Sequence, residues 1–476
     1  MPDARTDVAT RVPVQDARLA RSALAVLEAN WLGHATKPSP YLYPHQWSWD
    51  SACIAMGYAR WNQDRAETEL RSLFAGQWRN GLLPHIVFAK GDGRYFPGPD
   101  FWQASRSPDA PTGLETSGIV QPPIHATAAW RVYQRSGDRA QATAFLEELA
   151  PKLAAWHAYL YRERTRRSDG LVEIWHPWES GMDNSPLWDE ALTRIRPSPD
   201  EIPEYRRVDA QLADPAERPT DDEYDRYVYL VGLFRDLDYL PDRIREATPF
   251  ALQSALFNSL LVQSNRDLAA IARLLGDDPE PFESWAEQTA AGVDAKLWDE
   301  EAAVYADYDV TAERRVGVRT AAGLAPLHAG IPNDERARRM IAMLAGSRVE
   351  VDDARGWAVT SLAPDDPGFM PTRYWRGPIW PILNWALQSG LDRYGYSDLA
   401  AEVRRALIDL SSGSGFWEHY SPLTGRGQGG EQFAWTAGLV LEVLATELER
   451  GKEGTPVNGG HSDTSGSEST SNERRE

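Results

Sequence analysis

Apolar residues recur at helical spacing in about a dozen separate segments of this 476-residue chain, whereas segments with the alternation of a β-strand are few. Some loops between these segments are short, and others are long and aromatic. We therefore expect an all-α fold in which helical hairpins close into a toroid and the loops at one rim form a cleft. An irregular helical solenoid is the competing architecture, but the chain has no fixed repeat period. The expected helices span residues 16–31, 51–61, 65–78, 124–135, 139–164, 225–240, 249–275, 279–298, 319–328, 334–345, 380–394, 398–411 and 432–448.

Composition restricts the class of protein. Hydrophobic residues make up 42% of the chain, but no apolar run approaches the ~20 residues needed to span a membrane. The first twenty residues lack the apolar core of a secretory signal, and the lone Cys53 excludes an internal disulfide. These features predict a cytoplasmic protein without a membrane partner. The formal net charge of -20 argues against a nucleic-acid partner, because phosphates require a basic surface. The sequence leaves a homo-oligomer open.

The run Trp175-His176-Pro177-Trp178-Glu179-Ser180-Gly181-Met182-Asp183-Asn184-Ser185-Pro186 has no helical or strand period, and its Gly, Pro and Asn residues indicate a loop. Its two tryptophans suit a cleft in which sugar rings stack and a carboxylic acid faces a glycosidic oxygen. The structural alternative is a buried corner in which Asp183 and Asn184 cap the next turn. The chain as a whole has 19 Trp, 18 Tyr and 12 Phe, an excess that also suits carbohydrate.

Glycoside hydrolysis needs one protonated acid at the leaving oxygen and a second carboxylate that acts on water or on the sugar. Asp183 and Glu418 are the better pair, because each lies in a separate aromatic loop. Glu179 is a candidate for orienting its neighbours. The acids considered in aromatic or Gly-rich loops are Asp50, Glu115, Glu179, Asp183, Glu418 and Glu431.

Rival chemistries lack their motifs. The nine His include no metal-binding spacing, and neither a Gly-x-Ser-x-Gly elbow nor a Gly-x-x-x-x-Gly-Lys phosphate loop is present. We therefore expect neither a cofactor nor a metal. His176 and His419 neighbour the two candidate acids, but a lone His is more often a hydrogen-bonded structural residue than a ligand.

Seven stretches, taken in order, resemble the bacterial glucosylglycerate and mannosylglycerate hydrolases of glycoside hydrolase family 63. The resemblance covers residues from about Ala20 to Leu448. The stretches are Tyr43 to Asp50, Gln77 to Gly81 with Pro84-His85-Ile86, Tyr95 to Pro99, Trp178 to Pro186, Glu223 to Tyr227, Tyr374 to Pro378 and Phe416 to Gly425.

The resemblance implies an (α/α)6 barrel and an inverting mechanism, with Asp183 as general acid and Glu418 as general base. The implied barrel spans residues 15–450 with two inserted cap or lid segments at about 81–123 and 187–224, hereafter the first and second insertions. Residues 451–476 are polar and should be disordered. The matching sugar-site positions are Tyr43, Trp47, Trp49, Asp50, His85, Gln121, Trp178 and Trp380, and those at the glycerate end are Tyr95, Arg218, Tyr224, Tyr374 and Trp375.

The sequence thus predicts an inverting α-glycosidase that hydrolyses 2-O-α-glucosylglycerate, with mannosylglycerate as a second substrate. Its partner is a small glycoside with an anionic glycerate aglycone, whose carboxylate a planar guanidinium such as that of Arg218 can bind. A trehalase-like or oligosaccharide glucosidase is one alternative. A non-catalytic carbohydrate-binding protein on the same barrel is the other, because a fold does not fix a function.

Overall fold

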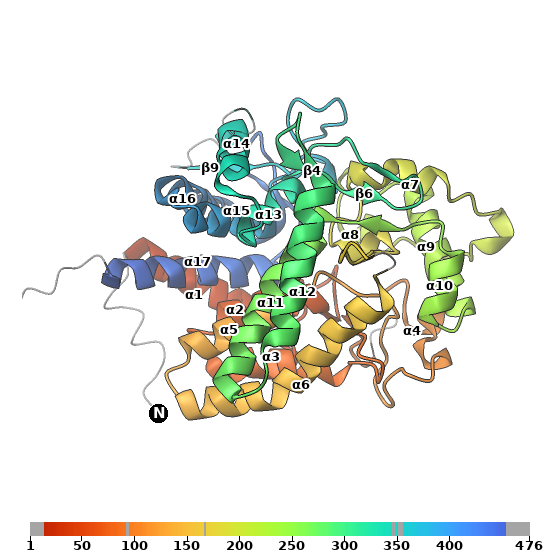
Figure 1. The fold of residues 1–476 in the computed structure, drawn as a ribbon, viewed down its shortest axis with the longest axis horizontal. Coiled ribbons are helices and arrows are strands. Elements are labelled where there is room, and N and C mark those ends of the chain that lie inside the picture. Colours follow the sequence, from red (N-terminus) through yellow and green to blue (C-terminus); the bar gives the residue numbers. More distant parts are fainter. Residues whose placement is uncertain are drawn as a thin grey trace, which may run out of the picture.

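The computed structural model describes residues 14–91, 95–165, 168–344, 346, 348–350 and 356–453, and the fold is mostly helical. Among these residues six helices pack in succession, each on the next and the last on the first, and we call them the inner ring. The long α11 runs through the middle of Figure 1, and α17 lies to its left in this view. The inner-ring helices are α2 (Ser48–Tyr58), α5 (His125–Arg135), α11 (Ala255–Leu275), α13 (Ala325–His328), α15 (Pro381–Arg393) and α17 (Ala434–Glu453).

Further helices pack on the outside of this ring and bury apolar residues of the inner helices between two layers. α1 packs on α17, α3 on α2, α6 and α12 on α11, and α16 on α15. These outer helices are α1 (Val14–Ala29), α3 (Gln63–Ala75), α6 (Arg139–Glu163), α12 (Glu280–Gly292) and α16 (Ser397–Ser414), and α14 (Asp334–Leu344) follows α13 in the chain. None of the helices in the described part of the chain combines the length and apolar character that crossing a membrane requires.

The helix ends follow from local chemistry. Ser254 accepts a hydrogen bond from the backbone N–H of Phe257, so α11 begins at Ala255 and not at the expected residue 249. Residues 319–328 were expected to form one helix. Gly323 and Pro326 interrupt it, and a 3₁₀ turn (Ala321–Leu324) precedes the short α13.

The strands are short and antiparallel, and their sequences carry too few residues to show alternation. They form five small sheets, β1-β2, β3-β6-β7, β4-β5, β8-β9 and β10-β11, among the described residues. The strands are β1 (Gln46–Trp47), β2 (Ile86–Val87), β3 (Leu252–Gln253), β4 (Trp298–Asp299), β5 (Val304–Tyr305), β6 (Tyr308–Asp309), β7 (Arg314–Arg315), β8 (Arg348–Glu350), β9 (Trp357–Val359), β10 (Trp417–Tyr420) and β11 (Gly427–Glu431).

Both insertions contain short helices. The first holds α4 (Pro99–Trp102), which packs on α9 (Asp221–Asp236). α7 (Asp189–Thr193) and α8 (Asp209–Leu212) belong to the second, and they lie with α9 and α10 (Pro241–Ala247) at the right of Figure 1. At the other end of the chain α17 continues to Glu453, so the first three residues of the expected disordered tail are helical. The remainder of that tail lies outside the described residues.

The inner-ring helices α2 and α17 approach each other closely at two glycines. A Cβ added to Gly57 would lie 2.4 Å from the Cα of Gly438, and one added to Gly438 would lie 2.8 Å from the carbonyl oxygen of Cys53. Because backbone and not a flexible side chain occupies the space, glycine is required for the two helices to touch.

We predict that Gly57→Ala destabilises the protein by about 1–3 kcal/mol, because the added methyl group forces two core helices apart. Gly413→Ala is the matched control. Gly413 lies in the helix α16 with no atom within 4 Å of an added Cβ, and alanine there should be neutral or stabilising by up to ~1 kcal/mol. Urea unfolding of both variants measures the difference. Equal stability of the two variants would contradict the packing described for α2 and α17.

Candidate active site

One cleft, with about 520 Å³ of empty space including its open mouth, gathers residues from six separate stretches of the chain. β1 pairs with β2, and the His85 N–H donates a hydrogen bond to the carbonyl of Ile119. These contacts bring three of the stretches side by side. The lining residues are Leu42, Tyr43, Trp47, His85, Tyr95, Phe96, Gln121, Trp178, Asp183, Val208, Asp209, Arg218 and Tyr224. Most of the residues expected to bind substrate therefore share this cleft.

The loop around Asp183 is anchored by Glu179. Its carboxylate accepts two hydrogen bonds of 2.8 Å from the guanidinium of Arg164 and a third, of 2.6 Å, from the Trp175 N–H. Glu179 and Arg164 are buried, so the pair is shielded from water. Gly181 has φ +72°, and a Cβ there would clash with the ring of Trp49. Glu179 thus holds the turn, and the side chain of Asp183 is partly exposed at the cleft wall.

Glu418 lies on strand β10, which corrects the expectation that it belongs to a loop. The β10-β11 register shifts at this residue, because Gly429 and Gly430 together oppose Glu418. Gly429 has φ +71°, and a Cβ there would lie 2.5 Å from Glu418 Oε2. A glycine in this conformation is the signature of a β-bulge that redirects a side chain. The strands of this hairpin are short, and the bulge places two glycines opposite one residue. The sequence of the hairpin therefore shows no strand alternation.

The carboxylate of Glu418 is buried, with 2% exposure, and receives hydrogen bonds from several directions. The hydroxyl of Tyr43 donates to Oε1 at 2.8 Å and that of Tyr374 donates at 3.1 Å. The Gly430 N–H donates to Oε2 at 3.0 Å, and Arg218 Nη1 lies 3.5 Å from Oε2. A carboxylate accepts but cannot donate, so these donors satisfy its ionised form.

Arg218 contacts Glu418 and further residues around it. Its guanidinium lies over the ring of Tyr374 and donates to the Tyr43 hydroxyl at 2.9 Å, beside its contact with Glu418. It is also 3.4 Å from Asp209 Oδ2. Sequence reasoning missed Asp209, which lies in the polar second insertion and has no motif to mark it.

Burial raises the pKa of Asp183 to about 7, and the negative charge of Glu418 adds to the increase while Arg218 opposes it. Burial also raises the pKa of Asp50 well above its usual range, again with a contribution from Glu418. Asp183, Asp50 and Glu418 therefore influence one another electrostatically within one site. Carboxyl groups with shifted pKa values in a cleft are typical of acid–base chemistry.

The remaining expected residues, with Asp50 and Glu418, are not among the residues that line the cleft, but several of them contact one another. Tyr374 contacts Glu418, and the Trp380 indole donates to the Tyr374 carbonyl at 3.1 Å. Trp375 stacks on Trp380 with ring centroids 3.5 Å apart. Trp49 packs edge-on against Trp435, and its backbone N–H donates to Gln121.

The other acids and the two histidines considered from sequence lie outside the cleft lining, and His419 is buried against the ring of Trp380. Glu115 and Glu431 are exposed. His176 is buried, donates from Nε2 to the Tyr227 carbonyl at 3.0 Å and accepts at Nδ1 from the Trp178 N–H. The interpretation of His176 as a hydrogen-bonded structural residue is confirmed.

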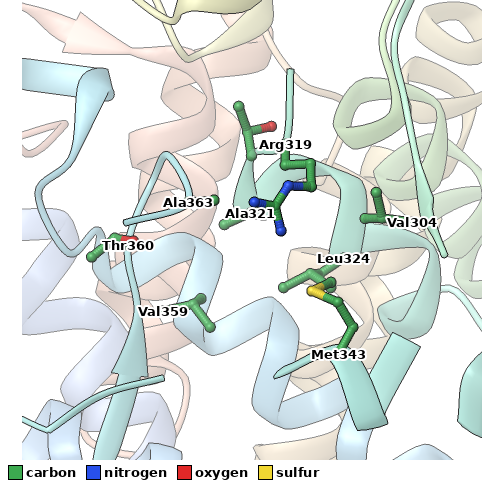
Figure 2. Close-up of a pocket in the computed structure, with 9 residues that line it drawn as sticks. Val304, Arg319, Ala321, Leu324, Met343, Val359, Thr360 and Ala363 are labelled. Carbon is green, nitrogen blue, oxygen red and sulfur yellow. The ribbon is translucent and has the colours of Figure 1, made fainter. Parts of the chain in front are cut away.

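A second cavity, of about 340 Å³, differs chemically from the cleft. Figure 2 shows aliphatic side chains, Met343 and the guanidinium of Arg319 around it, and the described residues that line it include no carboxylate and no aromatic ring. Those groups are the ones that sugar binding and acid catalysis require. The aromatic cleft is therefore the candidate active site.

A helical protein whose cleft combines tryptophan and tyrosine rings with electrostatically coupled carboxyl groups has the layout of a glycoside hydrolase. Residues 43–436 match the family described as the mannosylglycerate hydrolase MGH1-like glycoside hydrolase domain. The chain belongs to this family, which falls within glycoside hydrolase family 63. The resemblance expected from the sequence is confirmed.

Individual relatives align along nearly their whole length. A mannosylglycerate hydrolase of Rubrobacter radiotolerans is 47% identical over 426 residues, covering 90% of this chain and 96% of the relative. A glucosylglycerate hydrolase of Mycolicibacterium hassiacum is 38% identical and covers 90% and 98%. The crystal structure of a Thermus thermophilus mannosylglycerate hydrolase with Tris and D-glycerate has a TM-score of 0.82 at 43% identity, covering 89% and 99%. A periplasmic trehalase of Citrobacter koseri is more distant, with 25% identity over 68% of this chain.

The raised pKa of Asp183 predicts a pH-dependent cost to stability. Between the ordinary value of 3.8 and about 7, the folded protein retains a proton that the unfolded chain has released, so stability falls as pH rises. Asn cannot ionise. Asp183→Asn should therefore be more stable than the wild type at pH 8, on the order of 1–3 kcal/mol allowing for partial exposure, and nearly equal at about pH 4.

Urea unfolding at both pH values measures this difference. Glu69 and Asp307 also have pKa values raised by burial to about 7, but they titrate in both proteins and cancel in the comparison. Parallel pH dependence of the wild type and the variant would show that Asp183 is not desolvated in the folded protein.

Proposed function

We propose that this protein is an inverting α-glycosidase that hydrolyses 2-O-α-glucosylglycerate and mannosylglycerate to the hexose and glycerate. The observation that carries the proposal is that Asp183 and Arg218 line one aromatic cleft while the same Arg218 contacts the buried carboxylate of Glu418 at 3.5 Å. The names of the relatives at 38–47% identity support the substrate class.

We assign the fold to an (α/α)6 barrel spanning residues 15–450, with the two insertions as cap segments. The closed succession of six inner helices, with outer helices packed on them, supports this assignment. In such a barrel the loops at one rim come from every hairpin, which explains how a single cleft draws on six separate stretches.

In the mechanism that we assign, Asp183 is the general acid and Glu418 the general base. The proton of Asp183 passes to the glycerate oxygen as the bond from that oxygen to the anomeric carbon breaks. A water molecule attacks the anomeric carbon from the opposite face and gives its proton to Glu418. A pKa of about 7 keeps much of Asp183 protonated near neutral pH, as this role demands.

The charged side chains of the cleft lining other than Asp183 are Asp209 and Arg218, and both come from the second insertion. Arg218 contacts Glu418, Asp209 and the Tyr43 hydroxyl. A guanidinium has five N–H donors, so donors remain for a glycerate carboxylate beside these three contacts. We assign Tyr43, Trp47, Trp49, Asp50, His85, Gln121, Trp178 and Trp380 to the sugar, and Tyr95, Arg218, Tyr224, Tyr374 and Trp375 to glycerate.

Incubation with glucosylglycerate, mannosylglycerate and trehalose, followed by NMR from the first seconds, tests the reaction. We expect the β-hexose to be released first from both α-linked glycosylglycerates, because inverting enzymes place water between carboxyl groups about 6.5–9.5 Å apart. Trehalose should react far more slowly, since a neutral disaccharide gains nothing from Arg218. Initial release of the α-anomer would mean retention. Absence of any hydrolysis would favour a non-catalytic sugar-binding protein.

Hydrolysis of α-glucosyl fluoride distinguishes the roles of the two acids, because its fluoride leaves without a proton from a general acid. Asp183→Asn should reduce turnover of glucosylglycerate by about 10²- to 10⁴-fold but leave fluoride hydrolysis much less affected. Glu418→Gln should abolish both, because both need an activated water. Steady-state rates of the two variants on the two substrates measure this. Equal losses for Asp183→Asn on both substrates would remove Asp183 from the role of acid.

A further inference from the structure

The carboxylate of Glu223 joins three segments of the site, although it does not line the cleft. It accepts hydrogen bonds from the Thr220 N–H at 2.6 Å and the Thr220 hydroxyl at 2.8 Å. The first of these bonds, together with the bond from the Glu223 N–H to the Thr220 hydroxyl oxygen at 3.2 Å, forms the capping box of α9. The carboxylate also accepts from Asn184 at 2.8 Å, Arg373 at 3.0 Å and Arg376 at 3.1 Å. A capping box does not need these last three contacts, which require a different explanation.

The contact with Asn184 acts directly on the loop of the proposed acid. Asn184 follows Asp183 in the chain and is buried, with 1% exposure. Its amide nitrogen donates to Glu223, and its amide oxygen lies 3.4 Å from Arg373 Nε. The Tyr227 hydroxyl donates to the Asp183 carbonyl at 2.6 Å. Residues of α9 therefore hold both the carbonyl group of Asp183 and the side chain of the residue that follows it.

The contacts with Arg373 and Arg376 connect Glu223 to the segment that carries Tyr374. These two arginines flank Tyr374, whose hydroxyl donates to Glu418. Tyr374 has φ +32°, a conformation that a non-glycine residue keeps only when its surroundings enforce it. The Glu223 carboxylate binds both flanking guanidinium groups and so ties this strained turn to the Asp183 loop.

We propose that Glu223 is a positioning residue that fixes the Asp183 carboxyl group toward the glycosidic oxygen by clamping Asn184 to the Arg373–Arg376 turn. This inference rests on the proposed function, since it concerns the same acid. Two carboxylate oxygens satisfy all five donors, whereas the single oxygen of an amide cannot. Gln at this position preserves the capping box but turns an NH₂ group toward the Asn184 amide or an arginine.

The experiment compares turnover of glucosylglycerate with turnover of α-glucosyl fluoride in Glu223→Gln. Only the first substrate needs the proton of Asp183, and the ratio of the two rates does not depend on the fraction of folded enzyme. A misplaced acid should lower this ratio by about 10- to 100-fold relative to the wild type, because small displacements of a reacting group cost rates of that order. The KM for glucosylglycerate should change little.

Glu201→Gln is the matched control. Glu201 forms the same kind of capping box, accepting from the Ser198 N–H at 2.7 Å and the Ser198 hydroxyl at 2.9 Å in the same insertion. Its ratio should equal that of the wild type. If Glu223→Gln does not fold, Asn184→Ala tests the same clamp from its other end and should lower the ratio to a similar degree.

The outcomes separate this inference from the proposed function. If the wild type hydrolyses glucosylglycerate but the ratio of the two rates is unchanged in Glu223→Gln or in Asn184→Ala, the positioning role is overturned. An equal fall in Glu201→Gln overturns it as well, because capping alone would then explain the effect. A wild type that hydrolyses neither glycosylglycerate overturns the proposed function and the inference together.

Discussion

The burial of the Glu418 carboxylate is the interaction on which the rest of the site depends. A buried charge is tolerated only when hydrogen bonds and an opposite charge replace the water that it has lost. Tyr43, Tyr374, Gly430 and Arg218 supply those contacts, and they come from four separate parts of the chain. The loop before α2, the turn before α15, the β11 bulge and the second insertion must therefore all converge on one residue. Their convergence fixes the shape of the cleft.

The charge of Glu418 also contributes to the raised pKa of Asp183. Asp183 lies among aromatic and aliphatic groups and within reach of the field of Glu418, so its proton is retained to a pH near 7. Glu418 is surrounded by donors, whereas burial dominates the environment of Asp183. Two carboxyl groups in contrasting environments are what an acid and a base working at one pH require. The contrast arises from packing, because both side chains are ordinary acids in the unfolded chain.

The sequence predicted the long helices well, because an apolar stripe repeated over four or five turns has few interpretations. Most of their ends moved by only a few residues, as for α5, expected over 124–135 and found over His125–Arg135. The strand that carries Glu418 was missed, since four residues opposite a glycine bulge show no period. Asp209 and the junction at Glu223 were missed for a related reason. Their importance lies in contacts with residues distant in sequence, and a capping box was a sufficient local explanation for Glu223.

The second insertion supplies most of the charged side chains around the cleft. Apart from Asp183, Asp209 and Arg218, the lining is made of aromatic, amide, imidazole and aliphatic groups, which bind hydroxyl groups and sugar faces without regard to charge. Arg218 and Asp209 both come from the second insertion, and Arg207 binds Asp209 from the same segment with contacts of 2.8 and 2.6 Å. The positive charges of Arg207 and Arg218 are balanced by the carboxylates of Asp209 and Glu418. In the function that we propose, a substrate carboxylate therefore gains from the planar, bidentate geometry of the Arg218 guanidinium and not from an excess of positive charge.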